Sequence, residues 1–196
     1  GLALFCLPAG VLADPGDPAD VVRGVATRMI EALSERREEF TRTPALLEDV
    51  VREELLPVLD VEYSARLILG RAGRGASDEQ VRSFAEAMSD VLVARYAEGL
   101  IEYRDREQVE VLPTRGELNE RMTRVRTRVR LLNGNFIPVD YVFRLTEGSW
   151  KAFDVIVEGI SYVTTYRGQI MPQVQASGID EVTRRLRSGE IELSEE

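Results

Sequence analysis

Two carboxylates, Asp154 and Glu158, stand four residues apart in a segment whose alternating pattern predicts a strand. That spacing returns both side chains to one face, as in an active site that uses paired carboxylates as acid and base. The chain has no His, and Cys6 is its single cysteine, which removes the side chains that most metal and nucleophilic sites use. We therefore expect that the protein is not an enzyme and that it binds no metal or cofactor. We interpret the two acids as groups that fix a turn and a helix start.

Four arginines, at positions 124, 126, 128 and 130, alternate with Val125, Thr127, Val129 and Leu131. Guanidinium groups match phosphate oxygens, so this row could bind an anion. We favour the alternative of a solvated sheet face, on which acids of neighbouring strands such as Asp140 and Glu110 offset the repulsion between the arginines. The net charge of −9, from 34 acidic and 25 basic residues, disfavours nucleic acid as a partner.

Helices are predicted wherever apolar residues recur at three- and four-residue spacing. Asp17 and Asp60 are candidate N-caps, and Ser77 with Gln80 forms a capping box, while glycines predict an exposed loop over 71–76. The predicted helices span residues 18–40, 44–55, 60–70, 77–103, 161–176 and 179–186.

The hydrophobic period changes to two beyond residue 105, which predicts strands. Turn residues at 133–135 and 147–149 separate strands expected at 125–131, 137–145 and 150–157, and an earlier strand is expected near 109–112. Helices followed by a strand meander and further helices predict an α+β domain, in which helices cover one face of a curved antiparallel sheet of about four strands. Such an arrangement can form a cone with an apolar cavity.

The two ends of the chain differ from this domain in composition. Residues 1–13 carry no charge and end in Val11-Leu12-Ala13, which resembles the apolar region and cleavage site of a signal peptide. They are too short for the roughly 20 apolar residues of a membrane-spanning helix, so we expect an exported protein that is not integral to a membrane. An apolar strand or helix of the fold is the alternative. Residues 14–189 then form one domain, and 190–196 an acidic tail.

The run Asp154-Val155-Ile156-Val157-Glu158-Gly159-Ile160-Ser161, followed by Tyr166-Arg167, resembles the signature of the MlaC family, also called the toluene-tolerance (Ttg2-type) family. The resemblance covers most of the chain after Asp14 and departs from the family at 72–74, where relatives commonly carry an aromatic residue before the Arg. It implies a helical layer on a strongly bent antiparallel sheet, of NTF2-like or cystatin-like appearance, that encloses an apolar cavity.

The resemblance also implies a function without chemistry. It predicts a periplasmic carrier, monomeric as expected of a shuttle, whose cargo is a glycerophospholipid held by its acyl chains. The cargo would be exchanged between an outer-membrane lipoprotein–porin complex and an inner-membrane ABC-transporter/MCE complex, which maintains lipid asymmetry. The alternatives are an interaction or scaffold module with a filled core, and a small-molecule enzyme of the NTF2-like fold type.

A lipid carrier must hide a long apolar tail, because each buried CH₂ contributes about 0.8 kcal/mol and a 16-carbon chain on the order of 12 kcal/mol. Two tails need a pocket at or above the upper end of the roughly 300–1,000 Å³ usual for ligand sites. For Arg167 we expect an ion pair with Glu158 or Asp154. For each candidate wall residue the alternative is ordinary core packing; the candidates are Leu92, Tyr96, Leu100, Val125, Val129, Leu131, Val139, Tyr141, Phe143, Phe153, Val155, Val157, Ile160, Val163 and Tyr166.

Overall fold

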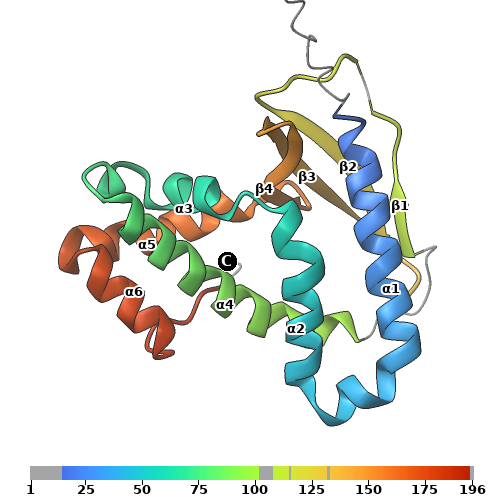
Figure 1. Cartoon of the computed structure of the whole chain (residues 1–196), viewed down its shortest axis with the longest axis horizontal. Coiled ribbons are helices and arrows are strands. Elements are labelled where there is room, and N and C mark those ends of the chain that lie inside the picture. The colour runs from blue at the N-terminus through green and yellow to red at the C-terminus, as the bar shows by residue number, and fades with distance from the viewer. Residues whose placement is uncertain (1–14, 102–107, 115, 132, 195–196) are drawn as a thin grey trace, which may run out of the picture.

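The computed structural model describes residues 15–101, 108–114, 116–131 and 133–194, and it confirms an α+β fold. An open antiparallel sheet in the order β1-β2-β3-β4-β5 is accompanied by helices, with α1 lying along the sheet and α3 to α6 grouped together (Figure 1). The helices and helical turns are α1 (Pro18–Arg42), α2 (Pro44–Leu55), η1 (Leu56–Val58), α3 (Val61–Leu69), η2 (Gly70–Gly73), α4 (Asp78–Leu100), α5 (Tyr162–Ser177) and α6 (Ile179–Arg187). The strands are β1 (Val109–Val111), β2 (Thr123–Arg130), β3 (Phe136–Thr146), β4 (Ser149–Val157) and β5 (Ile160–Ser161).

The helix starts are the ones that the capping residues predict. Asp17 accepts a hydrogen bond from the Ala19 amide at 2.9 Å, and Asp60 accepts one from the Tyr63 amide at 3.1 Å. In the capping box the Gln80 amide donates to Ser77 Oγ at 3.1 Å, and the Ser77 amide donates to Gln80 Oε1 at 3.0 Å. These bonds satisfy amides that the first turn of a helix leaves without a backbone partner.

Several predicted features need correction or fall outside the described residues. The expected loop at 71–76 begins as the helical turn η2, and the sheet has a fifth strand, β5, in addition to the four expected. Leu131 lies beyond the end of β2, where its amide donates to the Asn135 carbonyl in the turn to β3. Helix α4 ends at Leu100, and its expected end near residue 103 lies outside the described residues, as do residues 1–13.

The sheet carries most of its buried apolar side chains on the face that meets α1. Val125 on β2 pairs with Tyr141 on β3, which pairs in turn with Val155 on β4, so these three side chains form one row. At the α1 end of the sheet, Val125 packs in a cluster with Ala19 and Val22 of α1. The register between β3 and β4 shifts at Val142 and Phe143, where β4 contains one additional residue, as in a β-bulge.

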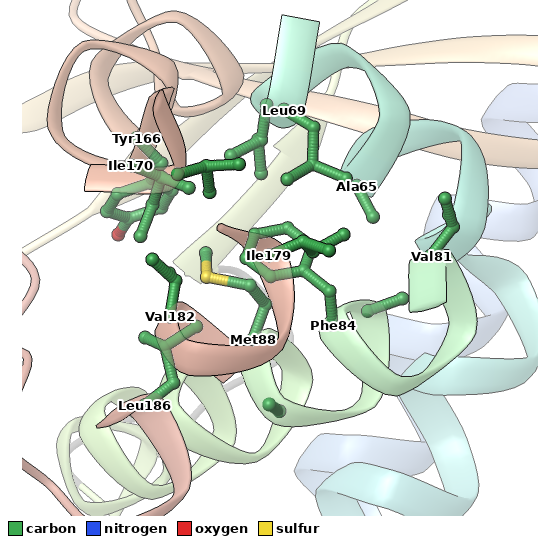
Figure 2. Close-up of a cluster of buried hydrophobic side chains, with 14 of the residues drawn as sticks. Ala65, Leu69, Val81, Phe84, Met88, Tyr166, Ile170, Ile179, Val182 and Leu186 are labelled. Carbon is green, nitrogen blue, oxygen red and sulfur yellow. The ribbon is translucent and has the colours of Figure 1, made fainter. Parts of the chain in front are cut away.

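Buried apolar side chains form three separate clusters instead of one continuous core. We call them the helical core, within α3 to α6, the α1–α2–α4 core, and the α1–sheet core. Figure 2 shows the helical core, in which Phe84 and Met88 of α4 lie among side chains of α3, α5 and α6. Each core joins a different set of helices and strands. The packed interior is therefore divided at the place where the three cores meet.

The segment after α6 packs onto the domain. Ile191 and Leu193 are buried in the helical core, and the Leu193 carbonyl accepts a hydrogen bond from Arg95 of α4 at 2.7 Å. Arg184 of α6 pairs with Glu190 at 2.7 Å. Residues 190–194, assigned to an acidic tail from their composition, thus contribute apolar side chains to the core.

Candidate functional site

An open pocket of about 160 Å³ lies where the three cores meet. Its wall includes Ala65 and Met88 from the helical core, Val93 from the α1–α2–α4 core and Ala152 from the α1–sheet core. Helices α3, α4 and α5 supply most of the wall, and β4 and the connection from α2 to α3 supply the rest. The lining is almost wholly apolar, so the pocket is suited to hydrocarbon.

Five of the fifteen candidate wall residues line this pocket, and the structure brings them together from three elements: Leu92 from α4, Phe153 and Val155 from β4, and Val163 and Tyr166 from α5.

The other ten candidates lie outside the pocket. Val125 and Phe143 are buried in the α1–sheet core and Tyr141 packs against it, while Leu100 packs against the α1–α2–α4 core. Val129 and Val139 are buried on the sheet, Leu131 and Val157 are half-buried, Ile160 is exposed, and Tyr96 lies against the lining residues Tyr162 and Tyr166. A role in binding stays a prediction for all fifteen.

The strand-to-helix junction of the signature is built around Asp154. Its carboxylate accepts a hydrogen bond from Ser161 Oγ at 2.6 Å and another from the Val163 amide at 3.0 Å. Ser161 Oγ in turn accepts from the Thr164 amide at 3.1 Å, which caps α5. Asp154 therefore fixes the start of α5, as expected, and with it the position of the lining residue Val163.

Glu158 and Gly159 form the turn between β4 and β5 in left-handed conformations, with φ of 51° and 88°. A glycine is favoured at such a position because a side chain there is strained. The Glu158 amide donates to the Pro138 carbonyl at 3.0 Å, which ties the turn to β3. The two acids of the signature thus have separate structural positions and do not form a paired site.

The prediction that Arg167 forms an ion pair with Glu158 or Asp154 is wrong. Arg167 Nε donates to the carbonyl oxygen of Leu67 at 2.6 Å, near the end of α3, where helix carbonyls lack amide partners. Gly70, with φ of 53°, ends α3 beside it, and a Cβ there would lie 3.4 Å from Met171 Sδ. Arg167 thus joins α5 to α3, two of the helices that form the pocket.

Two arginines of the row on β2 pair with acids of neighbouring strands, as the interpretation of a solvated face predicts. Arg128 Nε donates to Glu110 at 3.1 Å, and Arg124 lies 3.5 Å from Asp140. Arg126 donates to the Pro113 carbonyl at 3.2 Å. These contacts join β2 to both of its neighbouring strands, β1 and β3.

Polar contacts at the β4 side of the pocket anchor α3 to the sheet. Asp60, the cap of α3, pairs with Arg144 of β3 at 2.6 Å, and the Arg144 guanidinium lies 4.0 Å from the Tyr63 ring centre. Ser64 Oγ lies 2.7 Å from the Phe153 carbonyl oxygen. Among the described residues, no group of three or more acidic, His or Cys side chains is placed to hold a metal ion.

Comparison with known proteins places this architecture in a family. The chain matches the family model of the MlaC protein over residues 23–188. It is 30% identical over 164 residues to the toluene tolerance protein ttg2D of Pseudomonas putida, with 83% of this chain and 75% of the relative covered. The chain belongs to the MlaC family.

Two further proteins are similar to the chain, one in sequence and one in fold. The chain is 22% identical over 192 residues to the intermembrane phospholipid transport system binding protein MlaC of Haemophilus influenzae, with 95% of this chain and 87% of the relative covered. A phospholipid-binding protein of Ralstonia solanacearum, solved in complex with a phospholipid, superposes with a TM-score of 0.75 over 87% of this chain and 99% of that chain. At 20% identity this superposition shows a shared fold.

Several lining residues of this MlaC-family pocket were missed by the sequence reasoning. Val61, Ala65 and Ile68 of α3 line it, as do Leu56 and Leu59 of the preceding connection. The spacing of the three α3 residues is a helical stripe, a signal that the sequence does carry. No helix among the described residues is long and apolar enough to cross a membrane.

Proposed function

We propose that this MlaC-family protein is a periplasmic carrier that holds a glycerophospholipid by its acyl chains. The observation that carries the proposal is the apolar pocket at the meeting point of three cores, in a fold shared with a protein solved in complex with a phospholipid. The name of the Haemophilus relative, a binding protein of an intermembrane phospholipid transport system, supports transport as the purpose of binding.

The pocket volume sets a requirement for this function. About 160 Å³ is below the roughly 300–1,000 Å³ of usual ligand sites, so a phospholipid tail needs a wider space. Widening at the boundary between cores leaves the packing inside each core intact, whereas widening within one core would break its close packing. Because the pocket lies at the boundary between the three cores, it can widen to take up a tail and close again when the tail leaves.

The carrier takes its cargo from one membrane complex and delivers it to another. We propose an outer-membrane lipoprotein–porin complex and an inner-membrane ABC-transporter/MCE complex as these partners, and a monomer as the carrying form. The proposal includes no catalytic step. Asp154 accepts hydrogen bonds from Ser161 and from the Val163 amide, and Glu158 is exposed on a separate turn, so the two acids are not paired.

The proposal is tested by extracting lipids from protein purified without detergent and measuring the phospholipid-to-protein ratio by mass spectrometry. We expect a stoichiometric ratio, and a large decrease in Leu92→Glu, because a charge in the pocket opposes burial of hydrocarbon. Met122→Glu is the matched control, since Met122 is 63% exposed and lies outside the pocket. A lipid-free protein that also fails to take up labelled phospholipid would favour an interaction module with a filled core.

A further inference from the structure

We infer that Tyr96 closes one end of the pocket from behind its lining and limits the length of acyl chain that the pocket accepts. The inference rests on the proposed function, because it assigns a specificity to the same pocket. It is drawn from the position of Tyr96 on α4 and from its contacts with two tyrosines of α5 that line the pocket.

Helix geometry places Tyr96 directly beyond the pocket. Met88 and Leu92 of α4 line it at a spacing of four residues, and Tyr96 follows at the same spacing, so the three lie along one face of the helix. Tyr96 is half-buried and is not itself a lining residue. Its side chain therefore lies where the row of lining residues on α4 stops.

Contacts with α5 hold the Tyr96 ring against the pocket. The ring stacks on that of Tyr162, with centroids 6.0 Å apart and an angle of 25° between the planes. The Tyr96 hydroxyl lies 2.7 Å from the Tyr166 hydroxyl, within hydrogen-bond distance. Tyr162 and Tyr166 also meet edge to face, with centroids 5.8 Å apart. The three rings form a cross-helix group that backs the lining with bulky, rigid side chains.

Apolar residues continue past the lining on both α4 and β4. Along α4, Leu100 follows Tyr96 by one turn; it is half-buried and packs against the edge of the α1–α2–α4 core. On β4, Val157 follows the lining residue Val155 on the same sheet face and is also half-buried. A tail that extends past the present lining along α4 or β4 would thus meet further apolar side chains.

The test compares uptake of labelled phosphatidylethanolamines that differ only in acyl-chain length, by the wild type and by Tyr96→Ala. Each methylene that gains burial raises affinity about fourfold, so two further buried methylenes should raise the ratio of long-chain to short-chain uptake roughly 15-fold. Tyr96→Phe is the matched control and should keep the wild-type ratio, because it retains the ring and loses only the hydroxyl. Tyr96→Leu, which keeps apolar packing, should shift the ratio in the same direction by a smaller factor.

The two proposals fail in different ways. An unchanged ratio in both Tyr96→Ala and Tyr96→Leu, with uptake intact, would overturn the assignment of Tyr96 and leave the carrier function standing. A change of ratio in Tyr96→Phe equal to that in Tyr96→Ala would also overturn it, because the hydroxyl would then be responsible. Absence of uptake by the wild type would overturn the proposed function and this inference with it.

Discussion

Replacing Asp154 by Ala should destabilise the fold through the start of α5. The carboxylate accepts hydrogen bonds from Ser161 Oγ and from the Val163 amide, at 2.6 and 3.0 Å. A hydrogen bond to a charged group contributes about 1.5–3 kcal/mol, and loss of a helix cap typically costs about 1 kcal/mol. The two bonds share one carboxylate and one helix start, so we expect a total loss of about 2–4 kcal/mol in the free energy of unfolding.

Urea unfolding followed by circular dichroism measures this loss as a decrease in the midpoint without a change in slope. Asp154→Asn retains one carbonyl oxygen as acceptor and should lose less. Glu158→Gln, on the exposed turn four residues later, is the control and should lie within about 0.5 kcal/mol of the wild type. The double variant with Ser161→Ala should lose less than the sum of the single losses, because the two side chains bond each other. Wild-type stability of Asp154→Ala would refute the structural role of this carboxylate.

Two further predictions concern the helical core and the surface. Phe84→Ala should lower the free energy of unfolding by about 3–5 kcal/mol, because Phe84 is fully buried in the helical core, and wild-type stability in urea would contradict that packing. The Arg184 guanidinium lowers the pKa of Glu190 to about 2, so the pair stabilises the fold at neutral pH and stops doing so as the pH falls towards 2. Arg184→Ala should return that pKa towards its usual value near 4.5, as followed by carboxyl NMR; an unchanged titration would argue against the contact.

The helices and main strands could be predicted from the sequence because their signals are local. Asp17, Asp60 and Ser77 have short polar side chains that can accept hydrogen bonds from nearby backbone amides. Each caps the start of a helix in the structure. Strand β5 carries no such signal, because two residues cannot show a period. It is formed only because the turn at Glu158 brings Ile160 back beside Val157.

The pocket could be predicted only in part, because alternation identifies the face of a strand and not what covers that face. Val125 and Val155 lie in one row of the sheet, through Tyr141. Val125 is buried under α1, whereas Val155 lines the pocket, and this difference depends on where α1 crosses the sheet. Arg167 shows the same limit, since its partner is the carbonyl of Leu67, which the sequence near Arg167 does not indicate.

The burial of residues after α6 has a consequence for when this protein can fold. The helical core begins with Ala65 of α3 and is completed by Ile191 and Leu193, which are separated from it by most of the domain. Contacts between residues so distant in sequence form late and slow the folding of a chain. We therefore expect the helical core to close only once the segment after α6 is in place. Such late closure would suit the export to the periplasm that the proposed function requires.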